Sequence, residues 1–103
     1  MSVINVTKAN FEAEVLKSDV PVLADFNAGW CGPCRAMKPM LDELAEGNTA
    51  YKIVSIDIDE EDELADQYDV SSIPCLVVFK GGEEVNRSVG LIPKDAIAEL
   101  VEG

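Results

Sequence analysis

The sequence predicts an α/β fold with a mixed sheet and helices on both of its faces. Short apolar runs alternate with amphipathic segments along most of the chain, a pattern typical of strands joined by crossover helices, which implies parallel pairing. The pair Gly81–Gly82 separates two strand-like runs, and such a pair is a hairpin signal that adds antiparallel pairing. Residues 1–103 are therefore expected to form a single α/β domain.

The first half of the chain alternates two strands with two helices. Residues 3–6 (VINV) are a short apolar run, and residues 21–28 (PVLADFNA) suit a buried central strand. Between them, Thr7 is a candidate N-cap for the first helix, and a second helix is expected to begin near Cys31. The expected apolar stripes are Phe11, Val15 and Leu16 in the first helix and Met37, Leu41 and Leu44 in the second.

The second half continues the alternation and closes with the hairpin. Residues 51–57 (YKIVSID) are expected as a strand, and residues 60–70 (EEDELADQYDV) as a short helix. Residues 75–80 (CLVVFK) are rich in β-branched and aromatic side chains, and residues 83–89 (EEVNRSV) form the partner strand of the hairpin. Pro93 is expected in the first turn of the last helix, a position that proline favours.

Charge excludes several classes of partner. The net charge is −12, from 20 acidic and 8 basic residues, so neither nucleic acid nor an anionic membrane surface is an expected partner. Much of the acid lies in residues 57–66, where a solvated face is favoured over a cation site because charge runs are usually solvated. No apolar run approaches the ~20 residues of a membrane span, and the N-terminus lacks the pattern of a signal peptide. The chain is therefore expected to be cytoplasmic.

The stretch NAGWCGPCRAM carries the clearest chemistry. Cys31 lies where a strand ends and a helix begins, so the unpaired N–H groups and the positive end of the helix dipole favour its thiolate. Cys34 follows one turn later, close enough in sequence to close a small disulfide ring. Pro33 fits the first turn of a helix. A CxxC motif in this βαβ setting predicts a redox-active dithiol.

Other interpretations of the two cysteines are weaker. A zinc or iron–sulfur site normally needs four Cys or His ligands, whereas the chain has 3 cysteines and no histidine, so neither a metal nor a cofactor is expected. A structural disulfide across so short a loop would restrain the unfolded chain little. A disulfide oxidant or isomerase, and a subunit that binds a partner enzyme whatever its thiol state, remain as alternative functions.

The motif WCGPC, with LADFNAG before it, SSIPC later and SVG near the end, resembles the thioredoxin family over essentially the whole chain. The resemblance implies a thioredoxin fold, with a central mixed five-stranded sheet flanked by four helices. It also implies reduction of protein disulfides, with electrons supplied by a thioredoxin reductase or an equivalent donor. We expect the chain to act as a monomer.

The resemblance also implies a role for each site residue. Cys31 matches the nucleophile, Cys34 the resolving thiol, and Asp25 a buried carboxyl group that assists proton transfer. Ile73 and Pro74 match a cis-proline turn whose preceding residue offers backbone hydrogen bonds to the substrate. The flat rim that receives substrate proteins is expected from Trp30, Gly32, Pro33 and Gly90.

Three positions depart from the family pattern. Asn27 stands where a tryptophan usually packs behind the active site, so packing there is expected to differ. Ser55 stands where many members have a lysine, and Lys52 should point to the other face of the sheet, so Asp25 is expected to have a raised pKa without a counter-charge. Cys75 stands where threonine is common and is expected to be a small, buried and unreactive side chain.

Overall fold

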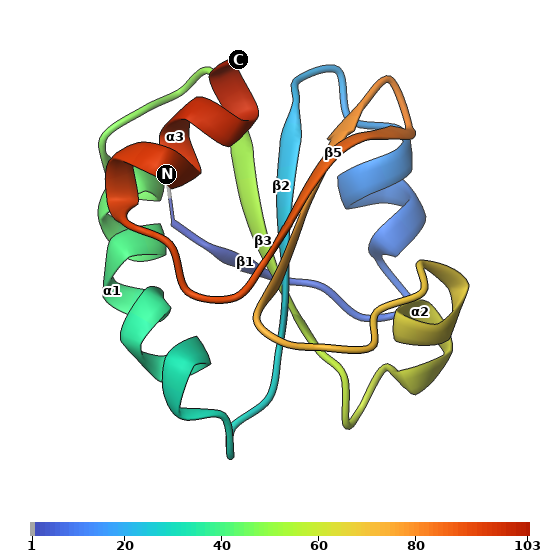
Figure 1. Cartoon of the computed structure of the whole chain (residues 1–103). Coiled ribbons are helices and arrows are strands. Elements are labelled where there is room, and N and C mark those ends of the chain that lie inside the picture. Colours follow the sequence, from blue (N-terminus) through green and yellow to red (C-terminus); the bar gives the residue numbers. More distant parts are fainter. Residues whose placement is uncertain (1) are drawn as a thin grey trace.

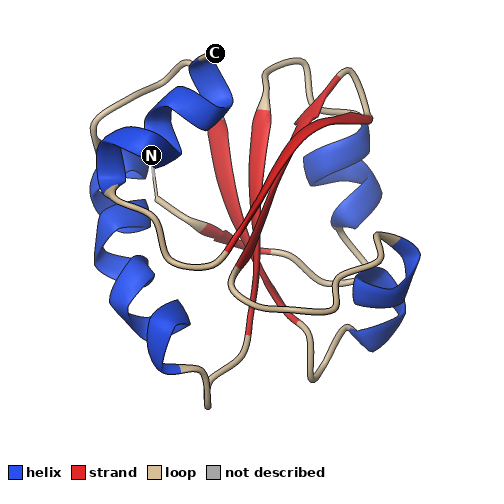
Figure 2. Cartoon of the chain, viewed as in Figure 1, coloured by secondary structure: helices blue, strands red, loops and turns tan. Residues whose placement is uncertain are grey.

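The computed structural model describes residues 2–103, which form one five-stranded sheet between two pairs of helices (Figures 1 and 2). Strand order is β1-β3-β2-β4-β5, in which β1, β3 and β2 pair in parallel and β4 pairs antiparallel with β2 and β5. The predicted fold class is confirmed. In chain order the elements are β1 (Ile4–Asn5), η1 (Glu12–Leu16), β2 (Val22–Asn27), α1 (Gly32–Glu46), β3 (Lys52–Asp57), α2 (Asp62–Gln67), β4 (Cys75–Lys80), β5 (Glu83–Val89) and α3 (Lys94–Glu102).

Central strand β2 has a helical layer on each side. Figure 1 shows α1 and α3 on one face of the sheet, with η1 and α2 on the other. Because side chains alternate along a strand, Leu23 packs on the α1/α3 side, whereas Ala24 and Phe26 pack on the η1/α2 side. Asp25 has the same parity as Leu23. Its side chain therefore faces the layer that contains α1.

The start of the first helix is capped from further upstream than its N-cap residue, Phe11. The Thr7 hydroxyl accepts a hydrogen bond from the Ala9 N–H (3.2 Å), and the Asn10 side chain accepts the Thr7 N–H (2.7 Å). These two bonds have the reciprocal pattern of a capping box, so Thr7 caps the turn at residues 8–10 that leads into the helix. The following segment, η1, is π-helical, with a hydrogen bond from the Lys17 N–H to the Glu12 carbonyl (2.8 Å), and its predicted apolar stripe faces the core.

Other boundaries lie close to those predicted. Strands β4 and β5 have the predicted ranges, and α1 begins immediately after Cys31. Pro93 precedes α3 as an extended N-cap residue and is not part of its first turn, which corrects the prediction by one position. Helix α2 ends at Gln67, and Asp69 then adopts a positive φ of 55° that is incompatible with a continuing helix. In the part of the chain that the structure describes, no helix is long and apolar enough to cross a membrane.

Candidate active site

The two motif cysteines lie at the junction between β2 and α1. Cys31 is the N-cap residue of α1, and its sulfur forms a disulfide with Cys34 across a Cα–Cα distance of 5.2 Å. The Cys34 backbone N–H donates a hydrogen bond to Cys31 Sγ (3.2 Å). Pro33 occupies the first turn of the helix, where its missing N–H removes no helical hydrogen bond. The predicted position of the pair is confirmed.

The surroundings of Cys31 favour a negative charge on its sulfur after reduction. The first turn of α1 contains no acidic residue, and its unpaired N–H groups and dipole point toward the N-cap. Arg35 lies close to the same loop, where its Nη1 donates to the Gly29 carbonyl (3.0 Å). In the disulfide form both cysteines are nearly covered, with exposed fractions of 6% for Cys31 and 5% for Cys34.

The loop before β4 lies against the cysteine pair. The peptide bond between Ile73 and Pro74 is cis, as the resemblance implies. Ile73 packs against the small cluster formed by Ala28 and the two cysteines. Gly90 has a positive φ of 99°, and its N–H donates to the Pro74 carbonyl (2.8 Å), so the end of β5 joins the same rim. The structure thus brings these predicted rim residues together around the disulfide.

Trp30 extends the rim toward solvent. Its side chain is 67% exposed, and its indole N–H donates to Asp59 Oδ2 (2.9 Å). Val89 and Leu91, on either side of Gly90, are also exposed apolar residues. Exposed apolar side chains grouped around a reactive pair are typical of a surface that receives another protein.

The acidic run at residues 57–66 is largely a solvated face. Asp59 contacts Trp30, Glu61 accepts the Lys8 backbone N–H, and Glu63 forms an exposed ion pair with the Lys8 ammonium group (2.7 Å). The other acidic side chains there are exposed or half-exposed.

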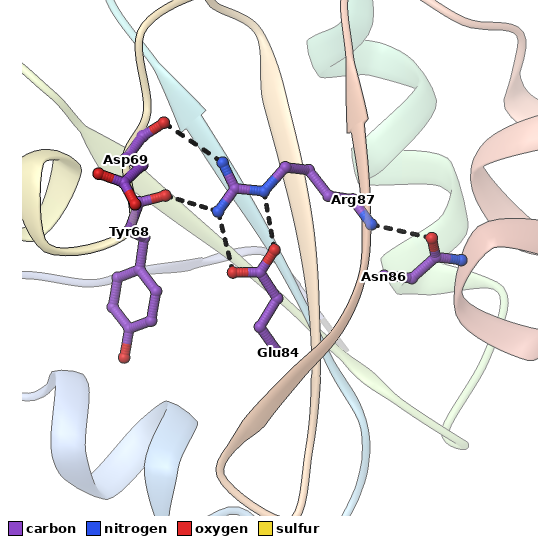
Figure 3. Close-up of polar contacts among 5 residues, drawn as sticks. All are labelled: Tyr68, Asp69, Glu84, Asn86 and Arg87. Carbon is purple, nitrogen blue, oxygen red and sulfur yellow. Dashed lines mark hydrogen bonds and ion pairs between the residues drawn. The ribbon is translucent and has the colours of Figure 1, made fainter.

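Arg87 holds the start of the loop that leads to Pro74 (Figure 3). Its guanidinium group donates to both carboxylate oxygens of Glu84 (2.7 and 2.9 Å). The same group donates to the carbonyls of Tyr68 and Asp69, which connects β5 to the segment after α2. Nothing in the sequence predicts this contact, because a single arginine in a strand carries no signal of its partners.

Asp25 is the buried carboxyl group of the site, with an exposed fraction of 5%. Loss of hydration raises the pKa of Asp25 from 3.8 to about 7, while a hydrogen bond from Asn27 acts in the opposite direction. Within residues 2–103, no group donates a hydrogen bond to Asp25 Oδ1. The predicted burial is confirmed, and it is the cause of the raised pKa.

The side chain of Asn27 contacts both Asp25 and Ser55. Its side-chain nitrogen Nδ2 lies 2.9 Å from the Asp25 carbonyl, 2.8 Å from Ser55 Oγ and 3.3 Å from Asp25 Oδ2. Asp25 and Ser55 are neighbours in the register of β2 and β3, which places all three side chains at one edge of the site. The asparagine at position 27 predicts a change of packing, but nothing in the sequence indicates these hydrogen bonds.

A cleft of about 790 Å³ opens beside Asn27. Asp25 and Cys34 both line it, and so does Lys38 of α1. Lys52 is directed to the opposite face, where its ammonium group bonds the Glu14 carbonyl (3.1 Å), as predicted. The cleft thus joins the buried carboxyl group, the second cysteine and the surface.

Cys75 is separated from the redox pair by the sheet. It is a free cysteine with an exposed fraction of 1%, and it packs with Val77 and Phe79 on the η1/α2 side. Burial is the main cause that raises the pKa of its thiol. The expectation that Cys75 is buried is confirmed.

A cysteine pair at the junction of a strand and a helix, facing a cis-proline loop on a mixed sheet, defines a thiol–disulfide oxidoreductase. Residues 2–103 match the Thioredoxin family model. The chain belongs to the thioredoxin family, and it is a dithiol–disulfide reductase with Cys31 and Cys34 as its redox pair.

Individual relatives agree with this assignment. The chain is 50% identical to a thioredoxin of Bacillus subtilis over 102 residues, which cover 98% of this chain and 96% of the relative. It is 47% identical to thioredoxin 1 of a Nostoc species over 98 residues, covering 94% and 92% of the two chains. A solved structure, that of a mutant thioredoxin from Halobacterium salinarum, superposes with a TM-score of 0.90 at 39% identity and covers 98% of this chain and 88% of that one.

Proposed function

We propose that the chain is a general protein disulfide reductase in which Cys31 attacks the substrate and Cys34 resolves the intermediate. The hydrogen bond from the Cys34 N–H to Cys31 Sγ, at the N-terminus of α1, is the observation that carries this assignment. The Cys31 thiolate attacks one sulfur of a substrate disulfide and forms a mixed disulfide, while the other substrate sulfur leaves as a thiolate and takes up a proton. Cys34 then attacks Cys31 Sγ, closes the Cys31–Cys34 disulfide and releases the second substrate thiol.

Asp25 accepts the proton of Cys34 in the second step. A carboxyl group with a pKa of about 7 is both protonated and ionised to a comparable extent near neutral pH, which suits a general base. Asp25 and Cys34 line the same cleft, so a proton passes between them there, directly or through water. The free oxygen Oδ1 is available for it.

Substrate proteins dock on the rim around Cys31. Trp30, Gly32 and Pro33 form one side, and Ile73, Pro74 and Gly90 form the other. The exposure of Trp30 and the contact of Ile73 with the cysteine cluster support this arrangement. The backbone of Ile73 pairs with an extended substrate segment, which gives affinity for many sequences because main-chain groups are common to all of them.

A thioredoxin reductase returns the oxidised pair to the dithiol form with electrons from NADPH, in the cytoplasm, and the chain acts there as a monomer. The net charge of −12 supports the monomer because copies repel one another.

The test is consumption of NADPH in the presence of a thioredoxin reductase, this chain and a peptide disulfide. We expect catalytic consumption that requires all three and is lost in a Cys31→Ser variant. Undiminished consumption by a variant with both Cys31→Ser and Cys34→Ser would contradict the proposal and favour a role independent of the thiols.

A further inference from the structure

The side-chain amide of Asn27 has more acceptors than hydrogens. Its Nδ2 carries two N–H groups, and three oxygens lie within hydrogen-bond distance. The two shorter contacts, to the Asp25 carbonyl (2.9 Å) and Ser55 Oγ (2.8 Å), occupy both N–H groups. The contact with Asp25 Oδ2 is longer, at 3.3 Å, and receives only a shared hydrogen. The Asp25 carboxylate therefore competes with the two shorter contacts, one of them to Ser55, for the donors of Asn27.

This arrangement treats the two oxygens of Asp25 differently. Oδ2 is held by Asn27, whereas Oδ1 accepts no hydrogen bond from residues 2–103. Cys34 lines the same cleft as the Asp25 carboxyl group. Holding one oxygen fixes the carboxyl plane and leaves the other oxygen to take a proton.

We propose that Asn27 is a positioning residue for the resolving step, and that Ser55 sets the strength with which Asn27 holds the Asp25 carboxylate. This inference rests on the proposed role of Asp25 as proton acceptor. In that step the proton of the Cys34 thiol passes to the Asp25 carboxylate, and the electron pair of the S–H bond becomes the new bond to Cys31 Sγ. The bond between Cys31 and the substrate sulfur breaks, and the substrate leaves as a thiolate that is protonated by Asp25 or by solvent.

Charged groups also line the cleft, but they lie at sites open to solvent. All of them are exposed or half-exposed, so salt screens their effect, whereas it leaves a hydrogen bond between partly buried groups largely unchanged. The groups that line the cleft are Arg35, Lys38 and Asp42 from α1, Asp57 from β3, and Glu60 and Glu61 from the loop before α2.

The competition for the Asn27 donors predicts that two substitutions shift the pKa of Asp25 in opposite directions. Asn27→Ala removes the donor to the carboxylate, so the ionised form of Asp25 is less stable and its titration moves to higher pH. Ser55→Ala removes the competing acceptor, so Asn27 turns a full N–H toward Oδ2 and the titration moves to lower pH. A residue that only supports the fold would not give this pair of opposite shifts.

The experiment is a single-turnover reaction of the reduced protein with excess peptide disulfide, followed from about pH 5 to about pH 9. Release of the second peptide thiol reports the attack by Cys34. In Asn27→Ala we expect the pH midpoint of this rate to rise by about 0.5–1 pH unit, which makes the step about three- to tenfold slower at pH values below the midpoint. In Ser55→Ala we expect the midpoint to fall by about 0.5 pH unit. Both shifts should persist at ~1 M salt. Asn86→Ala, which removes an exposed amide that bonds the Leu100 carbonyl, is the matched control and should leave the midpoint unchanged.

The Asp25→Asn variant distinguishes a failure of the proposed role of Asn27 from a failure of the proposed role of Asp25. Loss of the pH dependence in Asp25→Asn would support the role of Asp25. If Asn27→Ala and Ser55→Ala then shift the midpoint of the otherwise unchanged protein in the same direction, or leave it in place, the inference about Asn27 is wrong and the role of Asp25 stands. If Asp25→Asn leaves the profile intact, the role of Asp25 is wrong, and the inference fails with it. If Asn27→Ala does not fold, Ser55→Ala decides alone, and an unchanged or raised midpoint in that variant contradicts the inference.

Discussion

Replacement of Asp25 by asparagine should make the protein more stable at neutral and alkaline pH. The carboxyl group is buried, and loss of hydration raises its pKa from 3.8 to about 7. A raised folded pKa means that the protonated form favours folding and the ionised form opposes it. The unfavourable contribution begins as the pH rises through the unfolded pKa and is complete above the folded one. The substituted amide side chain would carry no charge at any pH, so the variant would lack this contribution.

The size of the effect follows from the two pKa values. A tenfold change in proton affinity corresponds to about 1.4 kcal/mol, so the interval from 3.8 to about 7 amounts to about 4 kcal/mol at pH 8. The same relation gives about 2 kcal/mol at pH 5 and almost nothing at pH 3. The buried amide of asparagine carries a desolvation cost of its own, about 1–2 kcal/mol, since its new N–H groups need partners. We therefore expect a net gain of about 2–3 kcal/mol at pH 8, which becomes a net loss of about 1–2 kcal/mol at pH 3.

The assay is urea unfolding of the disulfide form at several pH values, for the parent and for Asp25→Asn. The exposed Asp19 provides a matched control, because Asp19→Asn removes a carboxylate without changing a buried site, and its stability should follow that of the parent. An equal slope of the unfolding free energy against urea concentration in all three proteins would show that each exposes the same amount of surface on unfolding. If Asp25→Asn is no more stable than the parent at pH 8, the carboxyl group is hydrated or paired, and the physical argument for its role as a base fails.

Three further predictions address other parts of the site. In the reduced protein Cys31 should react with an alkylating agent before Cys34, because the helix N-terminus and the Cys34 N–H stabilise its thiolate; peptide mapping that finds Cys34 labelled first would reverse the two roles. Cys75→Thr should leave reductase activity nearly unchanged, because Cys75 is buried on the other side of the sheet, and mass mapping of a Cys75 disulfide with either motif cysteine would contradict this. Arg87→Ala should destabilise the protein by about 1–2 kcal/mol in denaturant unfolding, since the carbonyls it bonds lose a charged donor, whereas the exposed Lys80→Ala should change stability by less than about 0.5 kcal/mol.

Local sequence patterns predicted most of the fold. The strands of the hairpin and the start of α1 could be placed because β-branched runs, a glycine pair and a CxxC motif each have a short-range physical meaning. The first residue of the first helix could not, because the turn at residues 8–10 separates the capping residue Thr7 from the helix itself. Patterns of apolar residues report burial and carry little information on the residue at which a helix begins.

In the active site, too, some features could be predicted from local sequence patterns and others could not. The cysteine pair and the burial of Asp25 follow from the motif and from an apolar run, both of which are local. The hydrogen bonds of Asn27 and the place of Lys38 on the cleft depend on how β2, β3 and α1 pack together. A departure from the family pattern marked Asn27 as unusual, but only the packed structure shows what that side chain contacts.

Trapping of the reaction intermediate tests the central claim most directly. A reduced Cys34→Ser variant is mixed with a peptide disulfide, and the products are digested and mapped by mass spectrometry. We expect a stable mixed disulfide on Cys31, because the thiol that would release the peptide is absent. A variant that forms no mixed disulfide, or a peptide found on Cys75, would contradict the claim that Cys31 is the nucleophile of a dithiol reductase.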